Sequence, residues 1–243
     1  MKAVIATTTF FKKVDEIRAT LALRTIKKAI SYGYPIVVVD GGSPMELRNR
    51  FVAEGAALFE EKTQGMGPSR RQAMAEASKL ANNDGCVIWM EPEKHTLIPE
   101  LYKTVEPIFR KEADLVIPKR MSLASYPKEQ ELAELMGNLA FYYITKHGLD
   151  PWFGPRVANQ RALQFFLEYK GDYGDRWDSI FIPVLRAITA KLKVVNIEVS
   201  YAHPTEQATE ESGDIPFLIK RIEQLLNIVP ALKTEWQKLH PIT

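Results

Sequence analysis

Two glutamates separated by one proline, in the segment Glu91-Pro92-Glu93-Lys94, are the residues of this sequence best placed to do chemistry. They follow the apolar run from Val87 to Met90, and alternate residues of an extended chain point to the same side. Two carboxylates in this position can hold a divalent cation that bridges a diphosphate, because hard cations prefer oxygen ligands. A charged surface turn is the alternative. Lys94 can either repel a cation or bind phosphate in its place.

Polar residues also follow three other apolar runs. Thr7 and Thr8 close the first run, Asp40 closes the second, and a loop from Gln64 to Arg71 follows the third. The carboxyl ends of parallel strands meet at one edge of a sheet, where open α/β folds bind their ligands. The four polar strand ends together therefore predict one ligand site at that edge.

Asp40 and the loop after the third run suit different parts of a nucleotide. The Asp40 carboxylate can accept hydrogen bonds from a base or a ribose, or it can stabilise a turn. Gly65 and Gly67 allow the backbone to approach a ligand closely. Arg70 and Arg71 stand near the start of a helix, where a diphosphate can bind. An ordinary loop with two solvated arginines is the alternative.

Three features of the second half of the chain can act on an acceptor. Asp178 can serve as a general base, or it can be an aspartate of a helix first turn. His203 follows an expected strand and can be a metal ligand or a structural histidine. Trp152 and Phe153 can stack on a sugar face or form a hydrophobic plug over the core.

The hydrophobic pattern predicts the elements that position these residues. Strands are expected at residues 4–8, 35–40, 56–60, 87–90, 115–118 and 193–201. Helices are expected at residues 15–31, 68–82, 98–111, 129–146, 160–169, 176–190 and 215–239, with a further short helix ending near Gly55 and a kink or break at Pro230. Strands and helices alternate up to about Lys119, which is typical of parallel strands joined by right-handed crossovers. We therefore predict an α/β fold with a mostly parallel, twisted sheet and helices on both faces.

Composition narrows the range of functions. The chain has 243 residues, 46% of them hydrophobic and 26% charged, and a formal net charge of +2. This balance gives no argument for nucleic acid or a membrane surface as a partner. The single cysteine, Cys86, excludes a disulfide within the chain and a cysteine metal cluster. No run approaches the ~20 apolar residues of a membrane span, so we expect a cytoplasmic protein with one domain over residues 1–243.

Over residues 1–204 the order of these features resembles the glycosyltransferases of the A-type fold, especially the large family 2 group. Val37 to Ser43 resembles that family's strand ending in Val-Asp-Asp-Gly-Ser. Gln64 to Ala73 resembles its Asn-x-Gly-x-x-x-Ala-Arg-Asn stretch. Val87 to Glu93 resembles the strand that leads into its Asp-x-Asp motif, with glutamates replacing both aspartates.

The resemblance continues in the second half of the chain. Asp150 to Arg156 is similar to the Asp-Pro-x-x-Gly-x-Arg loop on the acceptor side of polyprenyl-phosphate sugar transferases. Arg176 to Asp178 stands where the catalytic Glu-Asp motif falls, and His203 stands where many members carry a metal-binding histidine. The size of the chain is also similar to that of small retaining enzymes that glycosylate glycerate or phosphoglycerate.

The resemblance implies a glycosyltransferase, a hexosyltransferase in particular, that takes a UDP- or GDP-linked sugar, an acceptor hydroxyl and a divalent cation (Mg²⁺ or Mn²⁺). Residues 1–120 would form the nucleotide-sugar-binding half with a Rossmann-like fold, residues 121–205 the acceptor and catalytic half, and residues 206–243 a C-terminal helical segment. It assigns donor binding to Thr7, Thr8, Asp40, Gly65, Gly67, Arg70, Arg71 and Glu91, acceptor binding to Trp152, Phe153, Gly154 and Arg156, metal binding to Glu93 and His203, and catalysis to Asp178 and Glu93. Asp178 would be the base of an inverting enzyme, or would orient the acceptor in a retaining one.

Two other functions compete with sugar transfer. Sugar-phosphate nucleotidyltransferases share a related sheet, but they carry a glycine-rich basic loop where this chain has Thr7-Thr8-Thr9-Phe10. A binding module that keeps the fold without transfer activity also fits the change to Glu-Pro-Glu-Lys. The apolar stripe of the last expected helix is either core packing or a dimer face, so a homodimer is one expected assembly.

Overall fold

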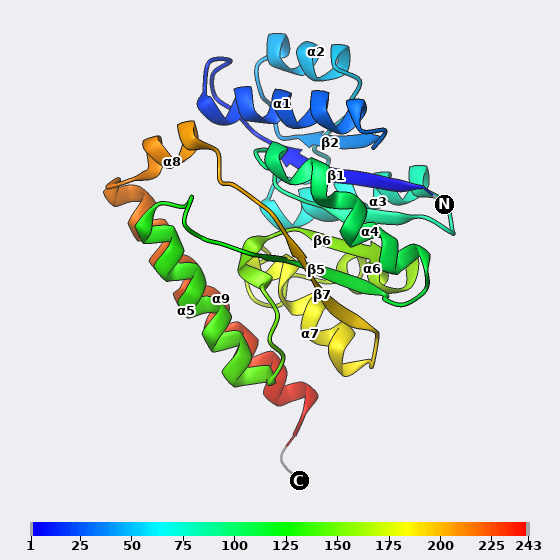
Figure 1. Cartoon of the computed structure of the whole chain (residues 1–243), viewed down its shortest axis with the longest axis vertical. Helices are drawn as coiled ribbons and strands as arrows, with labels where there is room; N and C mark the ends of the chain where they lie inside the picture. Colours follow the sequence, from blue (N-terminus) through cyan, green and yellow to red (C-terminus); the bar gives the residue numbers. More distant parts are fainter. Residues whose placement is uncertain (1, 242–243) are drawn as a thin grey trace.

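The computed structural model describes residues 2–241, in which the strands form a seven-stranded sheet (Figure 1). The strands lie in the order β3-β2-β1-β4-β6-β5-β7. Their bounds are β1 Ala3–Thr9, β2 Ile36–Asp40, β3 Ala57–Glu60, β4 Cys86–Trp89, β5 Leu115–Arg120, β6 Arg156–Asn159 and β7 Val194–Val199. Strand β6 runs antiparallel to β4 and β5, and the other neighbouring pairs are parallel. The predicted α/β class with a mostly parallel sheet is confirmed.

Nine α-helices and three short 3₁₀ helices connect the strands within residues 2–241. The α-helices are α1 Ile17–Ser31, α2 Met45–Ala53, α3 Met66–Ala81, α4 Leu101–Phe109, α5 Lys128–Thr145, α6 Gln160–Leu167, α7 Ile182–Thr189, α8 Thr205–Glu211 and α9 Ile215–Leu239. The 3₁₀ helices are η1 His95–Glu100, η2 Pro151–Phe153 and η3 Trp177–Ile180. Two of the α-helices begin at side-chain caps, because Asn159 and Asp214 accept hydrogen bonds from the amides of Ala162 and Phe217.

The strands alternate between two hydrophobic cores, one on each face of the sheet. In β2, Val37 and Val39 pack into the core beneath α3, α6 and α7, whereas Ile36 and Val38 pack into the core beneath α1, α2 and α4. All five residues of β2 are buried, as expected of a continuous apolar run in the centre of a parallel sheet. The predicted helices on both faces are therefore confirmed.

Three features differ from the expectation. Strand β6 is only four residues long and directly precedes α6, so its Arg-Val-Ala-Asn sequence carries no periodic signal. Helix α8, which was not expected, is seven residues long. A kink or a break was predicted at Pro230. The prediction of a break is wrong, because α9 continues through this position. Pro230 is exposed, while Ile228, Ala231 and Leu232 on the other side of the helix are buried in the core and hold it in place.

The strand order reverses at β1. The chain passes from β1 to β2 and β3 on one side, and then returns through α3 to β4 on the other side of β1. A crevice at the carboxyl ends of the strands forms at such a reversal, and it is where open α/β folds bind ligands. Residues that follow β1 and β4 are thus placed side by side.

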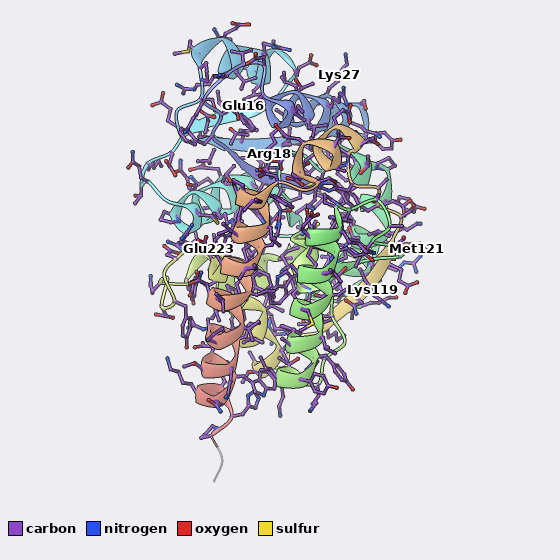
Figure 2. The ribbon with its side chains drawn as sticks, turned by 90° about the vertical axis from the view of Figure 1, so that its left-hand side faces the viewer. Glu16, Arg18, Lys27, Lys119, Met121 and Glu223 are labelled. Carbon is purple, nitrogen blue, oxygen red and sulfur yellow. The ribbon has the colours of Figure 1, made fainter. Side chains whose placement is uncertain are left out.

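Helices α5 and α9 pack against each other along one flank of the molecule (Figures 1 and 2). In Figure 2 they run in parallel columns, with the sheet behind them. Within the described residues 2–241, no helix has the length and apolar character needed to cross a membrane.

Candidate functional site

A cavity of about 430 Å³ opens at the reversal point of the sheet. Its wall combines Thr8 to Phe11 after β1, Glu91 to Lys94 after β4, the η2 loop, and the first turns of α9. This volume lies in the range of small-molecule and cofactor pockets. The cavity joins segments that are far apart in the sequence, so its wall is a product of the topology.

The cavity contains about half of the residues predicted to form the site. Eight of the predicted residues line it: Thr8, Arg70, Glu91, Glu93, Trp152, Phe153, Gly154 and His203. The other seven lie outside its wall: Thr7, Asp40, Gly65, Gly67, Arg71, Arg156 and Asp178. The convergence of the β1 and β4 ends is as expected, whereas the β2 end and most of the loop before α3 do not reach the cavity.

Glu91 is fixed in the cavity wall by its contact with Gly154. Gly154 has a φ of +103°, and a Cβ atom there would lie 2.2 Å from Oε1 of Glu91. Only glycine allows this approach, because a side chain would collide with the carboxylate. Oε2 of Glu91 is buried and has no hydrogen-bond partner within residues 2–241. This oxygen is available to a ligand hydroxyl.

Lys94 lies deep in the cavity wall between two aromatic rings. Its Nζ is 4.5 Å from the ring centroid of Phe153, 5.0 Å from that of Tyr201 and 3.7 Å from Oε2 of Glu91. Burial lowers the pKa of Lys94, while the charge of Glu91 opposes that shift. The cavity wall also holds Arg18, Arg70, Lys220 and Arg221, so Lys94 adds to a group of cations that suits phosphate better than a metal ion.

Asp40 does not line the cavity, and its carboxylate is engaged in hydrogen bonds with the chain itself. Oδ2 accepts from the hydroxyls of Thr9 (2.7 Å) and Ser43 (2.5 Å), and Oδ1 accepts from the amides of Gly42 (3.0 Å) and Ser43 (2.8 Å). The carboxylate is buried, and its acceptor capacity is taken up by the turn that follows β2. Asp40 therefore holds the end of β2 in place, as the turn alternative described.

The first turns of α3, which carry Gly67, Arg70 and Arg71, serve the structure more than the cavity. Arg71 makes two 2.6 Å hydrogen bonds to the carboxylate of Asp175, and a Cβ atom on Gly67 would lie 1.9 Å from Oδ1 of the same residue. These contacts, not a diphosphate, account for Gly67 and Arg71. Arg70 does line the cavity, and burial lowers its pKa to about 10. Its Nη1 donates to the carbonyl of Arg176, and its Nε has no partner within residues 2–241.

The proposed base Asp178 faces away from the cavity. Its carboxylate accepts hydrogen bonds from the hydroxyl of Tyr169 and from the amides of Arg176 (2.7 Å) and Asp175 (3.2 Å). A general base must lie within hydrogen-bond reach of the proton that it removes. Asp178 does not line the cavity, and its hydrogen bonds are those of the capping alternative.

We expect Asp178→Asn to lower the free energy of unfolding by about 1–3 kcal/mol, because the amide nitrogen would face donors that now bond to a carboxylate. Turnover should stay within roughly threefold of the wild type, since no reacting atom touches this residue. Urea unfolding and a donor-hydrolysis assay measure the two effects. Asp172→Asn, which removes a more exposed pair with Arg186, is the matched control. A loss of roughly a hundredfold in turnover with unchanged stability would restore Asp178 as the base.

A buried ion triad positions the loop that carries Phe153 and Gly154. Asp150 accepts hydrogen bonds from Nε (2.9 Å) and Nη2 (2.7 Å) of Arg120, and Nη1 of Arg120 pairs with Glu134. The Arg120 guanidinium also lies 4.8 Å from the ring of Phe153. Burial opposes ionisation, but the hydrogen bonds and charge of Arg120 outweigh it and lower the pKa of Asp150.

The residues predicted to bind the acceptor differ in whether they line the cavity or only support its wall. Trp152 and Phe153 are buried, and Trp152 packs edge-to-face on Phe181 at 4.7 Å, so both rings belong to the core. Their edges still line the cavity. Arg156 is buried beneath it, where its guanidinium donates to the carbonyls of Pro151, Pro155 and Ile180. Arg156 thus shapes the loop and does not face a ligand.

A divalent cation at Glu93 and His203 does not fit the contacts that these residues make. Nε2 of His203 lies 3.2 Å from Glu211, and Oε1 of Glu93 lies 3.7 Å from Arg18. Arg18 also donates a 3.0 Å hydrogen bond to Glu211. A guanidinium therefore stands between the two predicted ligands. Among residues 2–241, no group of three or more His, Cys, Asp or Glu side chains is arranged to hold a metal ion.

Three basic residues of the cavity were not predicted from the sequence: Arg18 of α1 and Lys220 and Arg221 of α9. Charged residues on amphipathic helices usually face solvent, so neither helix gave a local signal. The only available signal was the position of Arg18 in the first turn of the helix that follows β1. Burial and the charges of Arg18 and Arg221 lower the pKa of Lys220 to about 8.

No protein-family model and no curated protein sequence matches this chain. Solved structures do match. Glucosyl-3-phosphoglycerate synthase from Mycobacterium tuberculosis, in complex with phosphoglyceric acid, has a TM-score of 0.66 and 13% identity over 100% of this chain and 81% of that one. The same enzyme with Mn²⁺, UDP-glucose and phosphoglyceric acid has a TM-score of 0.64 and 15% identity over 97% and 79% of the two chains. A further mycobacterial protein has a TM-score of 0.66 and 12% identity over 96% and 75%. At these identities the likeness concerns the fold, and the chain has the A-type glycosyltransferase fold that the resemblance implied.

Proposed function

We propose that this protein transfers a sugar from a nucleotide-diphosphate donor to the hydroxyl of an acceptor. The observation that carries the proposal is the cavity at the strand reversal of an A-type glycosyltransferase fold, lined by the ends of β1 and β4 and by the η2 loop. Known structures of this fold hold UDP-glucose and phosphoglyceric acid. A UDP- or GDP-linked hexose is the donor that we expect here.

The residues suggest how the two substrates are arranged. Residues 1–120 supply the donor side, with Thr8 and the segment from Glu91 to Lys94 at its centre. Residues 121–205 supply the acceptor side through Trp152, Phe153 and Gly154. Oε2 of Glu91 accepts a hydrogen bond from a substrate hydroxyl, because it is an anionic acceptor that has no hydrogen-bond partner in the described part of the chain.

The transfer exchanges one bond to the anomeric carbon for another. The acceptor oxygen forms a bond to that carbon as the bond to the diphosphate oxygen breaks, and the electron pair leaves with the nucleoside diphosphate. The proton of the acceptor hydroxyl goes to solvent or to the departing phosphate. The chain accelerates this step by stabilising the negative charge that develops on the diphosphate.

Calorimetric titration with UDP-, GDP- and ADP-sugars, each with and without Mn²⁺, tests the function. Binding of one donor, followed by its hydrolysis or transfer, is the expected result. Failure of every donor to bind would overturn the proposal. Donor binding without turnover under any acceptor or metal condition, in the wild type as in Glu93→Ala, would instead identify a binding module.

We also propose that the protein is a homodimer joined through α5 and α9. Eleven large apolar side chains, 38% to 69% exposed, face away from the sheet on these two helices: Leu132, Leu135, Met136, Leu139, Tyr142 and Tyr143 on α5, and Ile215, Leu218, Ile219, Ile222 and Leu226 on α9. They recur at three- and four-residue intervals, the spacing of helices that pack in bundles. In Figure 2 both helices lie side by side and face the viewer.

The size of this surface favours a second copy as its occupant. Eleven such side chains expose on the order of 1,000 Å², more than monomers usually leave in one apolar patch and about what one partner of a stable interface buries. A twofold axis would bring the stripes of two copies together as a four-helix bundle.

We expect the double substitution Leu135→Glu/Ile219→Glu to convert a dimer into a monomer, because it places charges at the centre of the apolar surface. Light scattering coupled to gel filtration measures the mass of each species. Val52→Glu, at an exposed apolar residue of α2 outside this surface, should leave the dimer intact. A wild type that is monomeric at micromolar concentration, or that binds lipid vesicles through this surface as a monomer, contradicts the dimer.

A further inference from the structure

The carboxylates around His203 are already neutralised by a cation of the chain itself. Arg18 lies 3.7 Å from Oε1 of Glu93 and 3.0 Å from Oε1 of Glu211. Burial opposes ionisation of Glu211, but hydrogen bonds from His203 and Gln207 and the charge of Arg18 outweigh it and lower its pKa to about 2. Glu93 and Glu211, the two carboxylates nearest to Arg18, are therefore already ion-paired.

Two further cations face the same cavity without such partners. Lys220 and Arg221 form no ion pair with a carboxylate among residues 2–241, and the Arg221 guanidinium donates one 2.8 Å hydrogen bond to Gln224. Nε of Arg221 is buried without a hydrogen-bond partner in the same range. Figure 2 places Arg18 near the end of α9 that carries these residues. The three side chains come from α1 and α9, so the fold itself brings them together.

Three neighbouring cations, two of them without a carboxylate partner, repel one another. The effect is visible at Lys220, where the charges of Arg18 and Arg221 add to the effect of burial in lowering the pKa to about 8. A bound anion would remove this repulsion and satisfy the free Nε of Arg221. An unliganded cluster of this kind costs stability, which is typical of a binding site rather than of a structural ion pair.

We propose that Arg18, Lys220 and Arg221 bind the diphosphate of the donor directly, so that the site takes its donor without a divalent cation. This inference rests on the proposed function, which identifies the donor as a nucleotide-diphosphate sugar. The way in which the diphosphate is bound is inferred from the three cations. Lys220 and Arg221 supply two positive charges without carboxylate partners, against the two to three negative charges of a diphosphate, and Arg18 supplies guanidinium donors that it shares with Glu93 and Glu211. Arginine and lysine clamps can stabilise a departing phosphate group in the way that a metal ion does.

Calorimetry with inorganic pyrophosphate, UDP and uridine, in EDTA and in Mn²⁺, tests the inference. Pyrophosphate and UDP should bind in EDTA with affinities within about threefold of those in Mn²⁺. Lys220→Gln and Arg221→Gln should each weaken both ligands by roughly tenfold, the usual loss for one charge-assisted contact, and leave any uridine binding unchanged. Lys233→Gln, an exposed lysine of the same helix, is the matched control and should change nothing.

The outcomes separate this inference from the proposed function. Pyrophosphate and UDP binding that requires Mn²⁺ overturns the inference and leaves sugar transfer standing. Pyrophosphate binding in EDTA without binding of any nucleotide-sugar supports the cation site and overturns the proposed function. Absence of pyrophosphate binding in both buffers, or binding that neither substitution weakens, also overturns the inference. Comparison of the two buffers needs only the wild type, so a variant that fails to fold does not affect that test.

Discussion

Arg120→Met is expected to lower the free energy of unfolding by about 3–5 kcal/mol at pH 8, since it leaves two buried carboxylates without their cation. Arg120 lies at the centre of the triad with Asp150 and Glu134, and all three side chains are buried. Each partner has one further side-chain contact, from Asn138 to Asp150 and from Gln130 to Glu134, and these amides cannot neutralise the charge. Urea unfolding followed by circular dichroism measures the loss.

The same substitution has a predicted pH dependence. In the wild type the pKa of Asp150 is lowered, so its contribution to stability is present above its unfolded pKa and is lost as pH falls through the folded one. In the folded variant, Asp150 and Glu134 are buried without a cation, so they bind protons more readily than they do in the unfolded chain. The variant therefore loses free energy of unfolding as pH rises and both groups ionise. The difference between the two proteins should therefore be largest near pH 8 and should narrow toward pH 4.

Two further variants define the controls for Arg120. Lys119→Met removes a neighbouring cation whose 3.0 Å pair with Glu198 is exposed, and should cost less than about 0.5 kcal/mol. Arg120→Met/Asp150→Asn should recover part of the loss, because it removes one of the unpaired charges. An Arg120→Met loss as small as that of Lys119→Met would show that the triad does not hold the η2 loop.

Gly154→Ala is expected to reduce sugar transfer by roughly a hundredfold, the scale of loss that follows a displacement of about 1 Å in a reacting group. A Cβ atom at this position would lie 2.2 Å from Oε1 and 2.5 Å from Oε2 of Glu91. Either the η2 loop or Glu91 must move, and both line the cavity. Donor affinity and turnover are measured by calorimetry and by release of nucleoside diphosphate.

Gly174 provides a matched control for Gly154. It has the same φ of +103°, but a Cβ atom there would meet nothing within 4 Å. Gly174→Ala therefore carries the same backbone strain, about 1–3 kcal/mol, without the collision. We expect both variants to lose unfolding free energy through the backbone strain, with the larger loss in Gly154→Ala because of the collision. Activity should fall only in Gly154→Ala. Equal activity in both would mean that the position of Glu91 does not matter for transfer.

The sequence was sufficient for the class of the sheet and for six of its seven strands within residues 2–241. The buried run before Asp40 and the one before Glu91 identified β2 and β4, because a strand covered on both faces must be continuously apolar. Alternation with helices then fixed the parallel connections and the shared edge. Strand β6 was not predicted, because four residues are too few to show a period and because its pairing with β4 and β5 is a long-range contact.

The sequence alone therefore determined the α/β fold and the polar strand ends at one edge of the sheet, since hydrophobic periodicity is a local property of the chain. Only the tertiary structure decided which charged groups are free to act. Asp40 is saturated by its own turn and Thr9, Asp178 is held by Tyr169, and Arg18 stands between Glu93 and Glu211. Whether a carboxylate is a ligand or a structural group depends on the partners that distant segments bring to it. The Arg18 to Glu211 pair, 193 residues apart in the chain, is the clearest case.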